Sequence, residues 1–134
     1  MKQRLLFFFL LCSALTLATA SAGLLDGTEW QVQVVPTKET ANKEAPEARR
    51  FDDVLTFAKG KLVSQELKGK KVGAVRYSAT GNPDFYNWTT APVLRGKNKA
   101  QWDGVIKGAT LKGNLKWTTR DGRVLYFFVN GKKR

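Results

Sequence analysis

Residues 99–118 read KAQWDGVIKGATLKGNLKWT and show the clearest pattern of secondary structure in the chain. Apolar or small residues occupy every second position in both halves: Ala100, Trp102, Gly104 and Ile106, then Leu111, Gly113, Leu115 and Trp117. Charged and polar residues fill the positions between them. Alternation with a period of two is typical of a β-strand with one buried face. Because Gly108-Ala109 separates the two halves, the stretch predicts two half-buried strands joined by a tight connection.

Similar short apolar segments recur on both sides of this hairpin at intervals of about ten residues, the spacing of an all-β sandwich or barrel. They predict further strands at residues 27–35, 51–57, 61–67, 72–79, 85–91 and 123–129. An eight-stranded antiparallel up-and-down barrel is favoured because closure removes exposed sheet edges. A two-sheet β-sandwich is the alternative.

The connections are predicted from their turn residues. Asp121-Gly122 is predicted to form a two-residue hairpin turn. Residues 36–50 are charged and polar, which predicts a long solvated loop with a short helical turn. Loops of this length commonly serve as lids or binding loops, or are disordered. Residues 130–134 follow the last predicted strand and are expected to fray.

Residues 1–22 have the three parts of a cleavable export signal: Lys2 and Arg4, an apolar stretch over residues 5–17, and small residues before Gly23. The apolar stretch is shorter than the ~20 residues that a membrane-spanning helix needs. Cleavage after Ala22, with Ala20 as the alternative, leaves residues 23–134 as one domain. The protein is therefore expected to be exported, to the periplasm or the medium.

The composition excludes several kinds of active site. The chain has 134 residues, no His and a single Cys, and that Cys12 lies within the predicted signal. Histidine is the commonest general base near neutral pH and the commonest ligand of transition metals. Neither His-based triads nor thiol nucleophiles are available to the mature chain. We expect no catalytic residue, no cofactor and no metal, because the carboxylates form no pair and no calcium-loop spacing.

Leu25-Asp26-Gly27-Thr28-Glu29-Trp30 places a glycine shortly before a tryptophan at the start of the first predicted strand. This opening resembles that of the lipocalin and fatty-acid-binding group of barrels, and residues 36–50 resemble the lid loop of lipocalins. Residues 51–57 and the hairpin with Trp102 and Trp117 are similar to small exported lipocalin-like domains. The resemblance implies an eight-stranded barrel that holds an apolar ligand.

Large aromatic side chains dominate the inward positions of the predicted barrel. They are Trp30, Phe57, Tyr77, Trp88, Trp102, Trp117 and either Tyr126 with Phe128 or Phe127 alone. Eight strands enclose little more than their own side chains, and a useful pocket needs roughly 300 Å³ or more. Any cavity is therefore expected near one mouth of the barrel. The predicted ligand-binding residues are Tyr77, Trp88, Trp102, Trp117 and Tyr126.

The chain is strongly basic, with 23 Lys and Arg against 11 Asp and Glu and a formal net charge of +12. On the polar face of the central hairpin, Lys99, Lys107, Lys112 and Lys116 are the predicted anion contacts. A solvated surface is the simpler interpretation; adhesion to anionic glycan, lipid headgroup or a partner protein is the alternative. Nucleic acid is not favoured, because the tryptophans fall on the opposite face.

These observations predict a non-enzymatic, exported, lipocalin-like protein that binds a small apolar or amphipathic ligand. The alternative is a surface-adhesive module that uses the lysine-rich face. The oligomeric state is left open.

Overall fold

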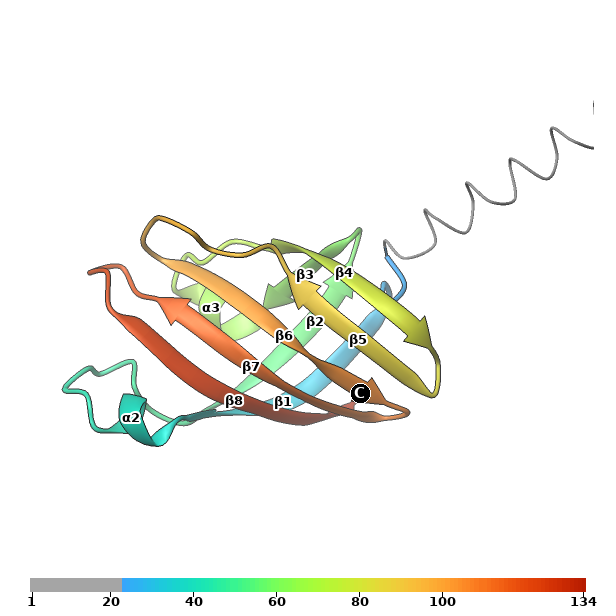
Figure 1. Ribbon diagram of the computed structural model, residues 1–134, viewed down its shortest axis with the longest axis horizontal. Coiled ribbons are helices and arrows are strands. Elements are labelled where there is room, and N and C mark those ends of the chain that lie inside the picture. Colours follow the sequence, from blue (N-terminus) through green and yellow to red (C-terminus); the bar gives the residue numbers. More distant parts are fainter. Residues whose placement is uncertain (1–22) are drawn as a thin grey trace, which may run out of the picture.

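The computed structural model describes residues 23–134, and the predicted export signal, residues 1–22, lies outside them. Its strands are β1 (Thr28–Pro36), β2 (Phe51–Ala58), β3 (Lys61–Ser64), β4 (Val75–Asn82), β5 (Phe85–Thr90), β6 (Lys99–Lys107), β7 (Thr110–Thr118) and β8 (Val124–Lys133). Each strand is antiparallel to the next, and β8 returns to pair with β1, so the sheet closes (Figure 1). The predicted eight-stranded up-and-down barrel is confirmed, and the β-sandwich alternative is wrong.

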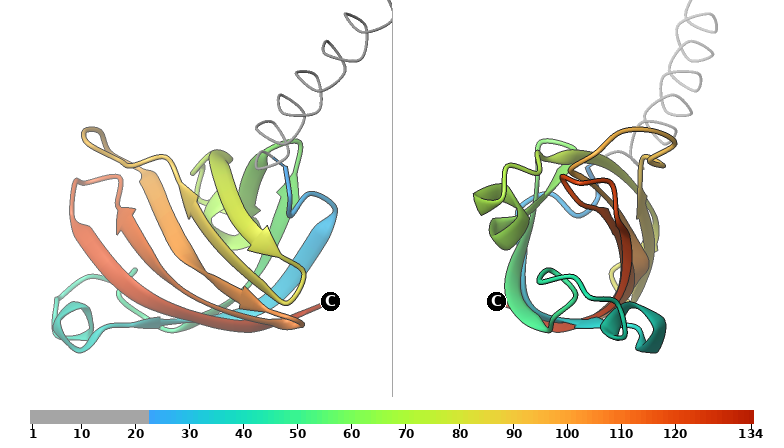
Figure 2. Two further views of the ribbon diagram at one scale, coloured as in Figure 1. Left: turned by 45° about the vertical axis from the view of Figure 1, so that its right-hand side comes forward. Right: turned by 90° about the vertical axis from the view of Figure 1, so that its left-hand side faces the viewer.

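The two ends of the barrel differ in their connections (Figure 2). The loop end carries residues 36–50 with helix α2 (Lys38–Ala41), helix α3 (Gln65–Gly69), and the loops over residues 91–98 and 119–123. The turn end carries the N-terminal segment 23–27 and three short turns. The right-hand view of Figure 2 looks onto the loop end, where residues 36–50 cross part of the ring.

The N-terminal segment closes the turn end with a small polar network around Tyr77. The Tyr77 hydroxyl accepts a hydrogen bond from the Leu25 amide at 3.0 Å and donates one to the Asp26 carboxylate at 2.7 Å. Asp26 in turn accepts from the amide of Gly60 at 3.1 Å. Leu25 is fully buried beneath this network. The first residues of the described chain therefore seal one end of the barrel.

The third predicted strand is wrong beyond Ser64, where helix α3 begins. The Ser64 hydroxyl accepts from the amide of Leu67 at 3.1 Å, as an N-cap does. The carboxylate of Asp53, on β2, accepts from the amide of Glu66 at 3.0 Å. Two side chains thus satisfy the free amides of the first turn and favour the helix. The chain leaves α3 through Val72, so β4 begins at Val75, later than predicted.

Strand β8 extends much further than predicted, to Lys133. Its last residues lie between β1 and β7, with Lys133 opposite Trp30 and Lys132 opposite Thr110. The expected fraying of residues 130–134 is therefore wrong, because closure of the barrel supplies partners on both sides.

The predicted two-residue turn at Asp121-Gly122 is also wrong. The amide of Gly122 donates to the carbonyl of Thr119, and the amide of Thr119 donates to the carbonyl of Arg123. Gly122 alone in this turn has a positive φ, +87°. A type I′ turn needs positive φ at both central residues, whereas a three-residue loop needs it only at the last.

Candidate functional site

Four of the five predicted ligand-binding residues point into the barrel. Tyr77, Trp88, Trp102 and Trp117 are all buried, whereas the Tyr126 side chain is 48% exposed. The interior position on β8 belongs to Phe127, and Tyr126 and Phe128 lie on the outer face. The prediction that Tyr126 lines the interior is therefore wrong. Residues 124–129 are apolar on both faces of β8, so the sequence alone did not show which of them point into the barrel.

The aromatic rings inside the barrel contact one another directly. Phe57 meets Tyr77 edge to face at 4.8 Å and Trp88 at 5.4 Å between ring centroids. Nearer the loop end, Phe127 meets Phe51 at 5.8 Å and Trp117 at 6.3 Å. Such contacts are typical of packed aromatic cores. Tyr77 and Trp88 thus belong to one packed aromatic cluster and Trp117 to another.

Two of these tryptophans carry a polar group without a partner in the described part of the chain. The indole N–H groups of Trp88 and Trp117 are buried and form no hydrogen bond there. The indole N–H of Trp30, by contrast, donates to the Thr28 hydroxyl at 3.0 Å. A buried donor without a partner costs about 1–3 kcal/mol. Each free N–H is therefore a position at which a hydrogen-bond acceptor would be stabilised.

The hollow at the loop end lies between the segment after α3 and the loop after β5. It has a volume of about 560 Å³. Apolar residues form most of its wall: Val72, Ala74, Val75, Ala91, Pro92, Val93, Leu94 and Ala100. Arg95 and Lys99 contribute the positive charge. The sequence places any cavity near one mouth beside the tryptophans; none of them lines this hollow, and Trp88 instead lines a hollow in the wall of the barrel.

Contacts across the loop end hold the two sides of this hollow together. The side-chain amide of Asn98 donates to the carbonyls of Lys70 and Lys71, at 3.2 and 3.1 Å. Lys70 Nζ lies 6.0 Å from the centre of the Trp117 ring, in cation–π contact. Ala100, on the wall of the hollow, lies opposite Trp117 in the β6–β7 pairing. The hollow, Lys70 and Trp117 therefore belong to one region.

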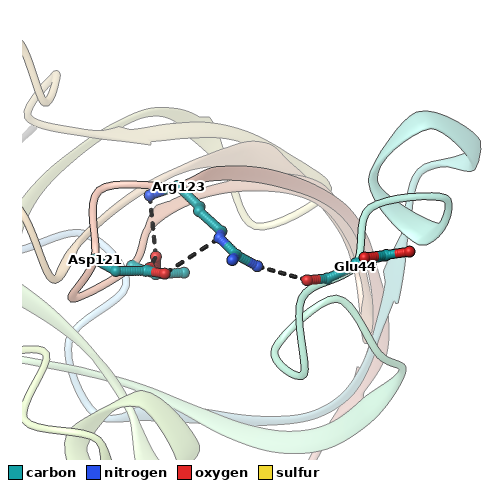
Figure 3. A network of polar contacts seen from close by, with 4 residues as sticks. Glu44, Asp121 and Arg123 are labelled. Carbon is teal, nitrogen blue, oxygen red and sulfur yellow. Dashed lines mark hydrogen bonds and ion pairs between the residues drawn. The ribbon is translucent and has the colours of Figure 1, made fainter.

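On the other side of the loop end, residues 36–50 are tied to the β7–β8 loop (Figure 3). Arg123 forms an ion pair with Asp121 at 3.2 Å and donates to the Glu44 carbonyl at 2.6 Å. The Asp121 carboxylate also accepts from the Thr119 hydroxyl, and this bond, more than Arg123, holds the pKa of Asp121 below its usual range. The long loop is therefore anchored against the barrel.

The four predicted anion contacts all lie on the outer face of β6 and β7. In the register, Lys99 is opposite Thr118, Lys107 opposite Thr110, Lys112 opposite Val105 and Lys116 opposite Gln101. Neutral residues therefore separate the lysines, and no two of them are directly paired between the strands. Lys99 lines the loop-end hollow, and Lys107 lies over the Phe85 ring at 5.6 Å. Their contact with anions remains a prediction.

Apart from Lys99, the sequence did not indicate the residues of the loop-end hollow as a site. Residues 92–95 lie in a connection without periodicity, and the strand predicted at residues 72–79 includes Val72. The available signal was the apolar character of Pro92, Val93 and Leu94 between two predicted strands. Leu94, at the rim of the hollow, is 88% exposed.

The ionisable groups show no arrangement typical of acid–base or metal chemistry in the described residues. Burial, followed by the hydrogen bond to Asp26, raises the pKa of Tyr77 and keeps its phenol neutral. No group of three His, Cys, Asp or Glu side chains within residues 23–134 is placed to hold a metal ion. In the same residues, no helix has the length and apolar character needed to cross a membrane.

No protein-family model matches the chain, and neither a curated protein nor a solved structure matches it.

Proposed function

We propose that the protein is an exported, non-enzymatic, lipocalin-like binding protein that takes a small amphipathic ligand with an anionic head at the loop end of its barrel. The observation that carries this proposal is the hollow of about 560 Å³, with an apolar wall and two cationic side chains, Arg95 and Lys99. Ligand sites are typically clefts of ≈ 300–1,000 Å³, mostly apolar, with a few polar groups that orient the ligand.

The apolar part of the ligand would lie on Val72, Val93 and Leu94. Leu94 is almost fully exposed, and burying a leucine side chain is worth about 1.5–3 kcal/mol. The head group would lie beside Arg95 and Lys99, since a guanidinium pairs well with a carboxylate or phosphate. The packed rings fill the interior of the barrel, which supports a site at the mouth and not in the centre.

The free N–H of Trp117 supports the same location. Trp117 is buried next to Ala100, which forms part of the wall of the hollow. An acceptor that reached past Ala100 would relieve the cost of the unpaired donor. Trp117 is also expected to report on binding through its fluorescence.

The test compares dodecanoate with dodecanol, which has the same chain without the charge, by calorimetric titration of residues 23–134. We expect dodecanoate to bind at least about tenfold more tightly than dodecanol, and Arg95→Gln to remove most of that preference. Lys107→Gln, at the opposite end of β6, is the matched control and should leave both affinities unchanged.

The proposal fails if neither amphiphile binds, or if Lys107→Gln weakens dodecanoate as much as Arg95→Gln does. Mass spectrometry of the recovered ligand tests the non-enzymatic part, because the ligand should leave the protein chemically unchanged.

A further inference from the structure

A second hollow, of about 680 Å³, lies on the outer wall of the barrel and crosses β4 to β8. Two cross-strand rows of outer side chains line it. The first row is Ser78, Thr89, Asp103, Asn114 and Phe128. The second row is Thr80, Asn87, Val105, Lys112 and Asn130. Each strand thus contributes one residue to each row, and we call this surface the outer groove.

Paired glycines form the floor of the outer groove. Gly104 on β6 lies directly opposite Gly113 on β7. A Cβ on Gly104 would overlap the carbonyl oxygen of Lys112, and one on Gly113 would overlap that of Asp103. The backbones can approach and bend at this point only because both residues lack a side chain, as glycines in curved sheets do. The hollow is therefore built into the sheet.

The outer groove continues around the barrel into a neighbouring hollow of about 520 Å³. Lys112 and Asn130 line both hollows, and Gln33 and Asp52 extend the second row onto β1 and β2. Gly131 is the floor here, where a Cβ would overlap the carbonyl oxygen of Gln31. The second row thus carries amide side chains at Asn87, Asn130 and Gln33, with Val105 and Lys112 between the first two.

The chemistry of the outer groove is that of an uncharged, hydroxyl-rich ligand. Among the ten outer side chains of its two rows, Asp103 and Lys112 are the charged ones and their charges cancel, although the whole chain carries +12. Asn114 donates to Asp103 at 2.9 Å, which fixes the orientation of both groups. Amides and hydroxyls offer donors and acceptors together. The Phe128 ring, 51% exposed, offers an apolar face at the end of the first row.

The spacing of the strands suits a chain of sugar rings. Neighbouring strands lie ≈ 4.7–4.9 Å apart, so five strands span about 19 Å. An extended β-linked glycan advances by a similar distance for each ring, whereas an extended peptide advances ≈ 3.3 Å per residue. A closed barrel also offers no free edge to which a peptide could add as a strand. We propose that the outer groove binds an extended neutral glycan chain with one ring per strand, its hydroxyls paired with the amide and hydroxyl side chains of the two rows and one ring stacked on Phe128.

The experiment titrates residues 23–134 with cellohexaose, which is extended, and with maltohexaose, which is curved, at about 0.05 M and 0.5 M NaCl. We expect cellohexaose to bind the more tightly, with an affinity that changes less than about twofold between the two salt concentrations, because no ion pair carries the contact. Phe128→Ala and Asn114→Ala should each weaken binding about tenfold or more.

Tyr126→Ala is the matched control for Phe128→Ala. Tyr126 is similarly exposed, lies two residues away on the same face of β8 and does not line the outer groove. Gln65→Ala, at an exposed position of α3, is the control for Asn114→Ala. All four side chains lie on the surface, so each variant should unfold at the temperature of the unmodified protein, which circular dichroism checks.

Several outcomes would overturn the inference. One is that none of three glycans binds: cellohexaose, the β-linked hexamer of N-acetylglucosamine and the β-linked hexamer of mannose. Another is retention of heparin alone, lost by 0.5 M NaCl, which would show adhesion of a polyanion through the lysines. A third is equal weakening by Tyr126→Ala and Phe128→Ala. None of these residues lines the loop-end hollow. Phe128→Ala should therefore bind dodecanoate as the unmodified protein does, so the glycan inference and the proposed function can fail independently.

Discussion

At the residue scale, Asp53 links barrel and helix α3. It lies on the inward face of β2 and is almost fully buried. Its carboxylate accepts from the amides of Val54 at 2.8 Å and Glu66 at 3.0 Å, and from the hydroxyl of Ser64. Burial nevertheless outweighs these three bonds and raises the pKa of Asp53 above its ordinary value of 3.8. Asp53 is therefore more easily protonated in the folded state than in the unfolded chain.

A raised folded pKa fixes the sign of the pH dependence. The contribution of Asp53 to stability is complete below its unfolded pKa and is lost as the pH rises through its folded pKa. In Asp53→Asn the amide can still accept from Glu66 and cannot ionise. We therefore expect the melting temperature of Asp53→Asn, relative to the unmodified protein, to increase as the pH rises above 4 and to level off above the folded pKa of Asp53.

Asp52→Asn is the control for this comparison, because it alters an exposed carboxylate on the adjacent residue of the same strand. Thermal melts at each pH provide the measurement. A relative melting temperature of Asp53→Asn that falls with rising pH would contradict the assigned direction.

At the scale of elements, β8 is the strand that closes the barrel. Four of its pairings with β1 involve residues 130–133, from Asn130 opposite Gln33 to Lys133 opposite Trp30. The amides of Lys133 and Arg134 also donate to the carbonyls of Ala109 and Glu29, both at 2.9 Å. These bonds are made by the backbone, so the side chains of the tail contribute little to them.

Deletion of residues 130–134 should therefore destabilise the whole barrel. Each lost hydrogen bond costs about 0.5–1.5 kcal/mol, and several together approach the 5–15 kcal/mol by which a typical domain is stable. We expect the truncated protein to be largely unfolded at 37 °C by circular dichroism. The double variant Lys132→Ala with Lys133→Ala keeps the backbone and should stay folded. A truncated protein with an unchanged melting temperature would show that β8 is not needed for closure.

Strand β8 and helix α3 show what the alternation of apolar and polar residues could not predict. The alternation of β7 and β8 located both strands, but the inward residue of β8 was ambiguous because Tyr126, Phe127 and Phe128 are all aromatic. Helix α3 was missed because its five residues are too few to show a helical period. Its cap Ser64 directly precedes it in the sequence, whereas the second side chain that caps it, Asp53, lies eleven residues before Ser64.

At the scale of the whole molecule, charge dominates the surface. The chain carries a formal net charge of +12, and residues 23–134 contain two ion pairs, Arg123 with Asp121 and Arg134 with Glu29. All four side chains are about half exposed, so these pairs contribute little. Repulsion among the remaining positive charges opposes the compact state.

Salt should therefore stabilise the protein. Raising NaCl from about 0.01 M to 0.5 M shortens the Debye length from 30 Å to less than 8 Å. We expect the melting temperature to rise by about 4 °C or more, equivalent to roughly 1 kcal/mol for a domain of this size. KCl should act equally, because the effect is screening. A melting temperature that is constant or falls with salt would mean that attractive pairs outweigh the repulsion.

The sequence by itself determined the class of fold and most strand positions, because the alternation of apolar and polar residues is local and shows which residues are buried. It also determined the chemistry that is absent, since a chain without His cannot build a site on it. Tertiary structure alone decided closure into a barrel, the strand formed by residues 130–133, the loop-end hollow and the outer groove. Closure, the strand at residues 130–133 and the loop-end hollow depend on residues that are distant in sequence and adjacent in space, such as Lys133 with Trp30 and Asn98 with Lys71. Pairing between strands brings such residues together, and a single sequence does not record it.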